Sequence, residues 1–157
     1  MKLTSTAFAD GEAIPARYTC ESGTEMGVSP PLAWSGVPAS ARSLALIVDD
    51  PDAPDPRAPK MTWVHWVLWD LPATAEGLAE NASALPAGAH HGKNDWKRAA
   101  WGGPCPPVGR HRYFFKLYAL DTVLGAISGG TKADLERAMK KHIVAEAQLI
   151  GTYEKRR

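Results

Sequence analysis

Four side chains in this sequence could together bind a polar ligand. They are a carboxylate, two imidazoles and a phenol, on Asp50, His65, His111 and Tyr113. They belong to three segments in which apolar, strand-like runs meet loops, and binding groups are often held at such ends by a rigid scaffold. Imidazole and phenol groups donate hydrogen bonds to anionic oxygens, and bonds to charged groups are the stronger ones. We therefore expect the four side chains to converge on one pocket for a small anion.

The spacing of these residues places them on strand faces. Asp50 lies two positions beyond Val48, so it shares the face of that residue if the strand continues. His65 lies inside an apolar strand, on the face of Trp63 and Val67. The remaining histidine and the tyrosine are two positions apart and also share a face. In such a pocket the carboxylate would orient a histidine, or accept a hydrogen bond from a protonated phosphate or an ammonium group.

Two enzyme classes use the same residue types. Asp50 and the two histidines also compose a facial triad for non-haem iron, although Tyr113 and the nearby prolines fit that site less well. Cys105 near His111 is a candidate hydrolase nucleophile, but its flanking prolines supply no amide donors for an oxyanion hole. A binding module without catalytic activity, metal or cofactor is the leading hypothesis. A protein-interaction role for the Trp-rich surface stays open beside it.

Three strands must position the four side chains. Apolar segments rich in aromatic and β-branched residues cover 43–48, 63–69 and 113–120, and bulk on both faces predicts that both faces are covered. Weaker strands are expected around 3–8, 14–18 and 32–34.

A C-terminal helix is expected near residues 131–150. Thr131 and Asp134 form a capping-box-like pair, and apolar residues then follow a helical spacing at Leu135, Met139, Ile143 and Ile150. A single late helix cannot cross over between several parallel strands. We therefore expect a mainly β fold, a β-sandwich of largely antiparallel sheets with peripheral helices, in one domain over residues 1–157.

Composition and charge exclude several classes. The chain has 157 residues, of which 45% are hydrophobic and 22% charged, which excludes a disordered protein. Its 18 Lys and Arg against 17 Asp and Glu lack the basic excess of a nucleic-acid binder. No apolar run approaches the roughly 20 residues of a membrane span, and the N-terminus is too polar for a signal peptide. We expect a cytoplasmic protein, and leave open whether Cys20 and Cys105 form a disulfide.

Three ordered motifs resemble the phosphatidylethanolamine-binding protein family, and more closely its bacterial Raf-kinase-inhibitor-like branch. The first is Asp-Pro-Asp-Ala-Pro at 50–54, and the second is His65 within an aromatic strand. The third runs from Gly103 to Tyr113 and reads Gly-Pro-x-Pro-Pro-x-Gly-x-His-Arg-Tyr. The similarity extends from about Leu3 to Tyr153.

This resemblance implies a β-sandwich with a small pocket that binds phosphate-like head groups. Asp50, His65, His111 and Tyr113 fall on the pocket positions, and Pro106 and Pro107 on its wall. It also implies a cis peptide at Ala53–Pro54, and bacterial relatives suggest a homodimer; kinase inhibition belongs to eukaryotic relatives and does not transfer. The sequence departs from the bacterial pattern at 97–100, where a smaller, glycine-containing loop is expected, so we expect a different rim near Trp96 and Trp101.

Overall fold

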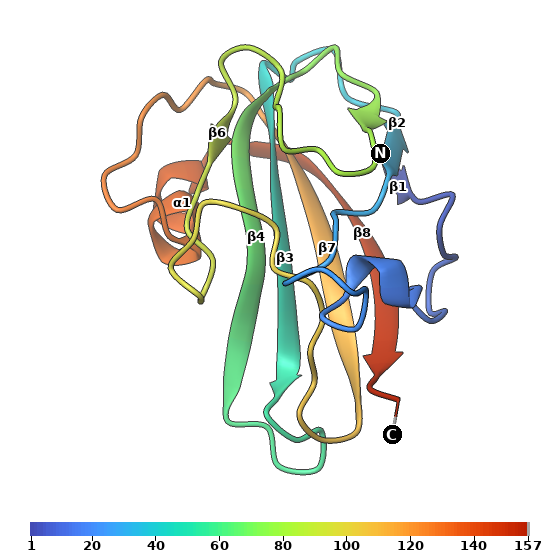
Figure 1. The fold of residues 1–157 in the computed structure, drawn as a ribbon. Coiled ribbons are helices and arrows are strands. Elements are labelled where there is room, and N and C mark those ends of the chain that lie inside the picture. The colour runs from blue at the N-terminus through green and yellow to red at the C-terminus, as the bar shows by residue number, and fades with distance from the viewer. Residues whose placement is uncertain (157) are drawn as a thin grey trace.

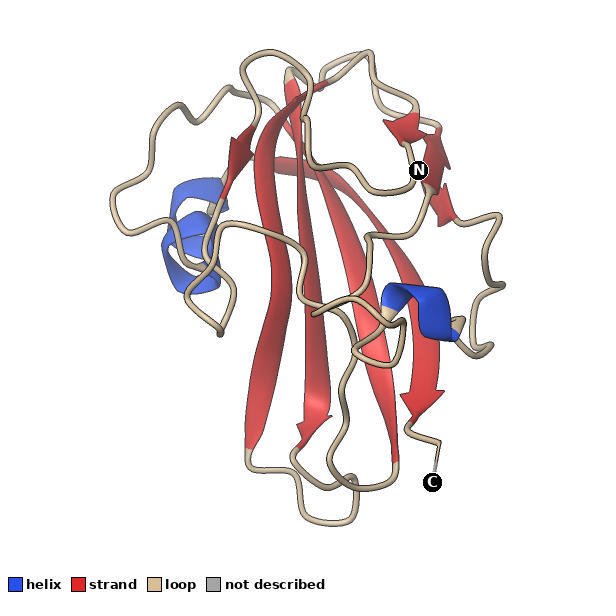
Figure 2. Ribbon diagram, in the orientation of Figure 1, coloured by secondary structure: helices blue, strands red, loops and turns tan. Residues whose placement is uncertain are grey.

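The fold is built on two antiparallel sheets. In a computed structural model that describes residues 1–156, the larger sheet has the order β6-β4-β3-β7-β8 and the smaller sheet the order β1-β2-β5 (Figure 1). The strands are β1 (Lys2–Thr4), β2 (Leu32–Ser35), β3 (Ser43–Ala53), β4 (Met61–Pro72), β5 (Gly77–Leu78), β6 (His90–His91), β7 (Arg110–Leu120) and β8 (Ile143–Glu154). Figure 2 shows that long strands dominate the fold, and within residues 1–156 helix is confined to two short segments. The predicted mainly β fold is confirmed.

The large sheet carries apolar side chains on both faces. Towards the small sheet it packs a core from β3, β4 and β7 that includes Trp66, Phe115 and Leu117, all fully buried. On its other face, Ile47 and Trp69 pack against an α-helix, α1 (Lys132–Met139). This two-sided covering explains why the three predicted strands have bulky residues at both odd and even positions.

The expected C-terminal helix is only half formed. Helix α1 (Lys132–Met139) begins at the predicted capping box, in which Thr131 and Asp134 satisfy each other's backbone N–H groups. The expectation that it continues to residue 150 is wrong, because Ile143–Glu154 forms β8 and pairs along β7. In β8 the inward positions alternate, with the side chains of Leu149 and Tyr153 buried, so period-two packing overrides the helical spacing.

Of the weaker strands expected in the N-terminal part of the chain, some are confirmed and one is wrong. Strand β2 confirms the strand expected around 32–34, and β1 covers only the start of the one expected around 3–8. The strand expected at 14–18 is wrong: residues Ala16–Tyr18 form a 3₁₀ turn, η1, preceded by one isolated bridge between Ala13 and Thr152. Pro15 precedes this turn with the extended backbone that it favours, and lacks an N–H for a strand ladder. Within residues 1–156, neither helical segment is long and apolar enough to span a membrane.

Candidate functional site

The four predicted side chains line one pocket. It lies at the end of the large sheet where β3 ends and β4 and β7 begin, and these strand ends are at the bottom of Figure 1. The cavity has a volume of about 330 Å³ and lies among the ends of β3, β4 and β7 and the loop that leads into β7. Asp50, His65, His111 and Tyr113 form its base, and none of them is more than 3% exposed. The rest of the lining is almost entirely apolar and comprises Ala53, Pro54, Met61, Trp63, Trp96, Cys105, Pro106 and Pro107.

A β-bulge in β4 aims His65 into the pocket. Two consecutive residues of β3 pair with Trp66 and Val64, so His65 between them has no partner across this ladder. The bulge puts His65 on the pocket face with Trp63, while Trp66 behind it enters the inter-sheet core. The expectation that His65 shares the face of Val67 is wrong, because the extra residue reverses the alternation and Val67 packs near α1.

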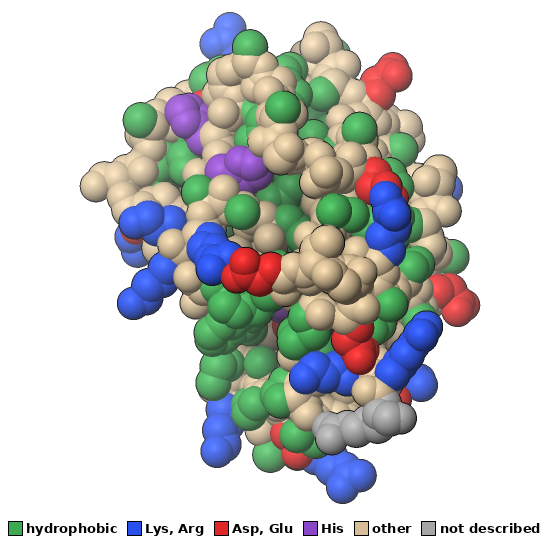
Figure 3. Space-filling view, in the orientation of Figure 1, with side chains coloured by type: hydrophobic (Ala, Val, Ile, Leu, Met, Phe, Trp, Pro, Cys, Tyr) green, Lys and Arg blue, Asp and Glu red, His purple; other side chains and the backbone are tan. Residues whose placement is uncertain are grey.

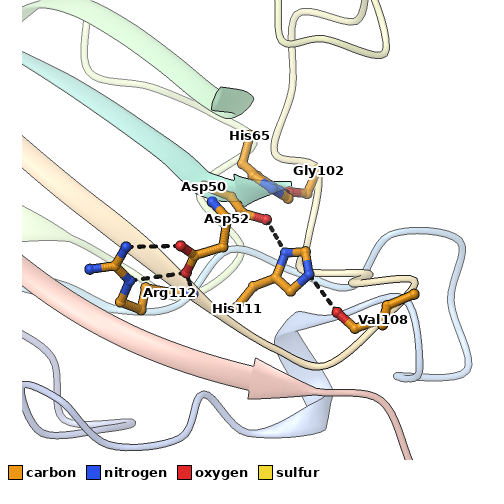
Figure 4. Close-up of polar contacts among 7 residues, drawn as sticks. All are labelled: Asp50, Asp52, His65, Gly102, Val108, His111 and Arg112. Carbon is orange, nitrogen blue, oxygen red and sulfur yellow. Dashed lines mark hydrogen bonds and ion pairs between the residues drawn. The ribbon is translucent and has the colours of Figure 1, made fainter. Parts of the chain in front are cut away.

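Both ring nitrogens of His111 are hydrogen-bonded within the protein (Figure 4). Nδ1 lies 2.6 Å from Oδ2 of Asp50, and Nε2 lies 2.8 Å from the carbonyl oxygen of Val108. A carbonyl only accepts, so Nε2 carries a hydrogen. One further proton is shared between Nδ1 and the carboxyl, and the pair has no net charge wherever that proton resides. Burial raises the pKa of Asp50, while the hydrogen bond from His111 opposes that shift.

His65 presents an acceptor to the pocket. Its Nδ1 lies 2.6 Å from the carbonyl oxygen of Gly102 and must donate to it, and the Gly102 N–H donates in turn to the carbonyl of His65 at 3.0 Å. Burial lowers the pKa of His65 to about 4, so the ring is neutral at pH 7. In this tautomer Nε2 has a lone pair and no hydrogen. The expectation that both imidazoles donate to a ligand is therefore wrong while the His65 ring is neutral.

The hydroxyl of Tyr113 is a hydrogen-bond donor, whereas Nε2 of His65 is an acceptor. It is buried and has no hydrogen-bond partner among residues 1–156. Burial raises the pKa of this phenol, so it remains an O–H donor at all ordinary pH values. The ring of His65 meets the ring of Tyr113 edge-on, with 5.1 Å between centroids, so the two residues that carry the donor and the acceptor are in contact at the base of the pocket.

A second carboxylate near the site is neutralised outside the pocket. Asp52 accepts from the backbone N–H of Arg112 and from two guanidinium nitrogens, at 2.8–3.0 Å, and these bonds hold its pKa below the usual range. In Figure 4 this pair points away from His111. Within the described part of the chain no lysine or arginine lines the cavity.

The loop at 97–100, where the sequence departs from the bacterial pattern, directly follows Trp96, which lines the pocket. The buried Asn94 side chain accepts from the N–H groups of Trp96 and Arg98 and donates to the carbonyl of Ala100. This turn sets Trp96 edge-on against the rings of His65 and Trp63, which gives the pocket an aromatic rim. Figure 3 shows hydrophobic side chains gathered on the lower half of this face, over β4 and the neighbouring loops.

The opposite wall is stiff and cross-linked. Pro106 and Pro107 line the pocket as expected, and Cys105 between them and Pro104 is joined to Cys20 by a disulfide. The backbone N–H of Cys20 also donates to the carbonyl of Pro104 at 3.1 Å. Since Cys105 has no free thiol in this state, the hypothesis of a cysteine nucleophile is wrong for the oxidised protein.

Comparison with known proteins decides the family. Residues 4–154 match the family model described as phosphatidylethanolamine-binding protein. The chain belongs to the phosphatidylethanolamine-binding protein family. Its relatives include a protein of Methanothermobacter thermautotrophicus named only UPF0098 protein, which is 49% identical over 98% of each chain. Bacterial and archaeal members are thus among its close relatives.

Two solved members of the family share the whole fold. A phosphatidylethanolamine-binding protein homologue from Chlamydia trachomatis has a TM-score of 0.88 and 44% identity, and the match covers 99% of this chain and 97% of that one. Escherichia coli YbcL, described as a new member of the mammalian family, has a TM-score of 0.86 and 33% identity, covering 99% and 98%. The Ala53–Pro54 peptide that the family resemblance implied to be cis is cis.

The donor set of this family member does not form the facial triad considered from sequence. Both nitrogens of His111 are engaged with Asp50 and Val108, and Nδ1 of His65 is engaged with Gly102. Within residues 1–156 no three His, Cys, Asp or Glu side chains are grouped as metal ligands would be. The pocket therefore offers one neutral imidazole acceptor and one phenol donor.

Sequence reasoning placed Trp63 on the face of His65 and Trp96 near the rim, and both line the pocket. It missed Met61 and the carbonyls that fix the rings. Met61 belongs to the same alternation, and Trp96 depends on the Asn94 turn, which has no strong sequence signal. Trp101, expected near the rim, instead packs on Trp66 in the core.

Proposed function

We propose that this family member binds a small phosphorylated ligand and does not convert it. The phosphoryl group would lie at the polar base of the pocket and its organic substituent against the aromatic rim. The observation that carries this proposal is that one buried base contains both the Tyr113 hydroxyl, a donor without a partner among residues 1–156, and Nε2 of His65, an acceptor. A pocket with few convergent polar groups and apolar walls is typical of small-molecule sites.

The shape of the pocket supports an organic phosphate. Pro106 and Pro107 form a rigid wall, and Met61, Trp63 and Trp96 form the facing rim. A cavity of about 330 Å³ is at the lower end of the volumes that hold whole small-molecule ligands, so a substituent larger than the phosphate has room there. Catalysis is disfavoured because His111, the histidine beside Asp50, has no free nitrogen with which to move a proton to or from a ligand.

Calorimetric titration with phenyl phosphate tests this proposal. Tyr113→Phe removes the hydroxyl donor at the base of the pocket and should weaken binding by about tenfold or more, since a hydrogen bond to a charged group contributes about 1.5–3 kcal/mol. Tyr118→Phe is the matched control, because Tyr118 lies on the same strand but packs with the α1 cluster on the other face. Equal affinity in the two variants would remove Tyr113 from the site, and the absence of binding to the unaltered protein would overturn the proposal.

Partners and compartment stay predictions. We expect no nucleic-acid partner, because the net charge is only +1. The homodimer suggested by bacterial relatives, and a protein partner for the Trp-rich surface, are proposals that sedimentation and pull-down experiments can test. The cytoplasmic location expected from sequence also stays a prediction. The Cys20–Cys105 disulfide argues against it, since such bonds persist mainly in oxidising compartments.

A further inference from the structure

The two free groups at the base of the pocket have opposite hydrogen-bonding character. The Tyr113 hydroxyl donates, and it has no partner among residues 1–156. The Nε2 of His65 only accepts, because the single hydrogen of the neutral ring is on Nδ1, which donates to the carbonyl of Gly102 at 2.6 Å. A fully deprotonated oxyanion has only acceptors. It would satisfy Tyr113 and place its lone pairs against those of His65.

The charges around the base also disfavour a dianion. The Asp50–His111 pair is neutral, and the Asp52–Arg112 pair is neutral. Behind His65, on the opposite face of the sheet, the buried carboxylate of Asp49 is held by two lysines that cannot reach the cavity. The titratable or charged groups around the base are therefore Asp49, Asp50, Asp52, His65, His111, Arg112, Tyr113, Lys116, Lys132 and Tyr153. A doubly charged ligand would lose solvation there without a cation to replace it.

We infer that the site selects a phosphomonoester in its singly charged, protonated form, whose P–OH group donates to Nε2 of His65 while another oxygen accepts from Tyr113. This inference rests on the proposed function and adds the ligand class to it. A phosphodiester, as in most phospholipid head groups, and a sulfate ester have the same single charge but no O–H to donate. The site should therefore discriminate against both.

This selection makes binding pH-dependent through the ligand. The second pKa of a phosphomonoester is about 6, so nearly all of it has lost the P–OH at pH 8. The apparent affinity should then fall about a hundredfold between pH 5 and pH 8, in proportion to the protonated fraction. His65 does not change charge in this range, since burial lowers its pKa to about 4.

The test is calorimetry of the unaltered protein with three probes at pH 5 and pH 8. Methyl phosphate is the monoester, methyl sulfate matches its shape and charge without the O–H, and dimethyl phosphate represents a diester head group. Methyl phosphate should bind at least tenfold more tightly than either control at pH 5, and should lose about a hundredfold by pH 8. In buffers of different ionisation heat at pH 7.5, its binding should take up about one proton, because the ligand is then mostly dianionic.

Each other result has a separate meaning. Equal binding of methyl sulfate and methyl phosphate at pH 5 would overturn the inference and leave the proposed function intact. Tighter binding of dimethyl phosphate would do the same and favour a diester head group. Proton uptake with methyl sulfate would show that the protein takes the proton, which also overturns the inference. If none of the probes binds, and phenyl phosphate does not bind either, the proposed function itself fails.

Discussion

Nδ1 of His111 lies 2.6 Å from the carboxylate of Asp50 while Nε2 of the same ring lies 2.8 Å from the carbonyl of Val108. Both residues are buried, at 0% and 3% exposure. The ring therefore joins β3, β7 and the proline-rich loop, and its main task is to hold the base of the pocket in place. His65, which has no carboxylate partner, is the imidazole that remains free to contact a ligand.

Removing the carboxylate should cost stability. In Asp50→Ala the buried Nδ1 of His111 loses its partner, and we expect the free energy of unfolding to fall by about 3 kcal/mol. Asp50→Asn should cost clearly less, because the amide can donate to a neutral Nδ1 and its oxygen can still accept from the N–H of Asp52. Urea denaturation at pH 7 measures both variants. Equal losses would show that the bond to His111 contributes little.

The neutral state of His65 predicts a specific pH dependence of stability. Its pKa is about 4 in the folded protein and about 6.5 when unfolded. Between these values the unfolded chain binds a proton that the folded protein does not, so the free energy of unfolding falls as pH falls. This contribution should reach roughly 3 kcal/mol by pH 4. In His65→Gln it should be missing, so the difference between the two pH–stability curves isolates it; parallel curves from pH 7 to 4 would contradict the burial of a neutral ring.

The long strands could be predicted because their burial is visible in the sequence. Apolar runs at 43–48, 63–69 and 113–120 have bulk on both faces, and the large sheet is covered on both faces. Strand β8 could not be predicted in this way. Its inward positions include the small residues Ala145, Ala147 and Gly151, so the alternation of apolar and polar residues along it is weak. Helical spacing from Leu135 to Ile150 competed with it, and long-range pairing with β7 decides the outcome.

The convergence of the site could be predicted, but the roles of its imidazoles could not. Family motifs and strand ends bring Asp50, His65 and His111 together, and the structure places them around one cavity. Which nitrogen is free depends on the carbonyls of Gly102 and Val108 and on a bulge in β4. Backbone carbonyls are present at every residue, so no residue type marks these two in advance.

The disulfide should contribute substantially to stability. It joins residues 85 positions apart, and loop-closure entropy for such a separation gives about 4.5 kcal/mol. Replacing both Cys20 and Cys105 with Ser should lower the free energy of unfolding by that order. Reductant should destabilise the unaltered protein similarly and leave the double variant unchanged. Equal stability of the oxidised protein and the double variant would show that the cross-link adds nothing.

The rim depends on Asn94. Asn94→Ala removes the acceptor for the N–H groups of Trp96 and Arg98, so hydrogen exchange at these two amides should accelerate at least tenfold. Asn94→Asp retains that acceptor and loses only the donor to the carbonyl of Ala100, so it should protect the two amides better. Unchanged exchange in the alanine variant would show that other contacts hold the turn.

The most direct test of the binding site is a crystal structure of the protein grown at pH 5 with phenyl phosphate. We expect tetrahedral density at the base of the pocket, within hydrogen-bond distance of the Tyr113 hydroxyl and of Nε2 of His65, with the phenyl ring beside Trp63 or Trp96. Phenyl phosphate bound elsewhere on the molecule, with this base unoccupied at saturating ligand, would contradict it.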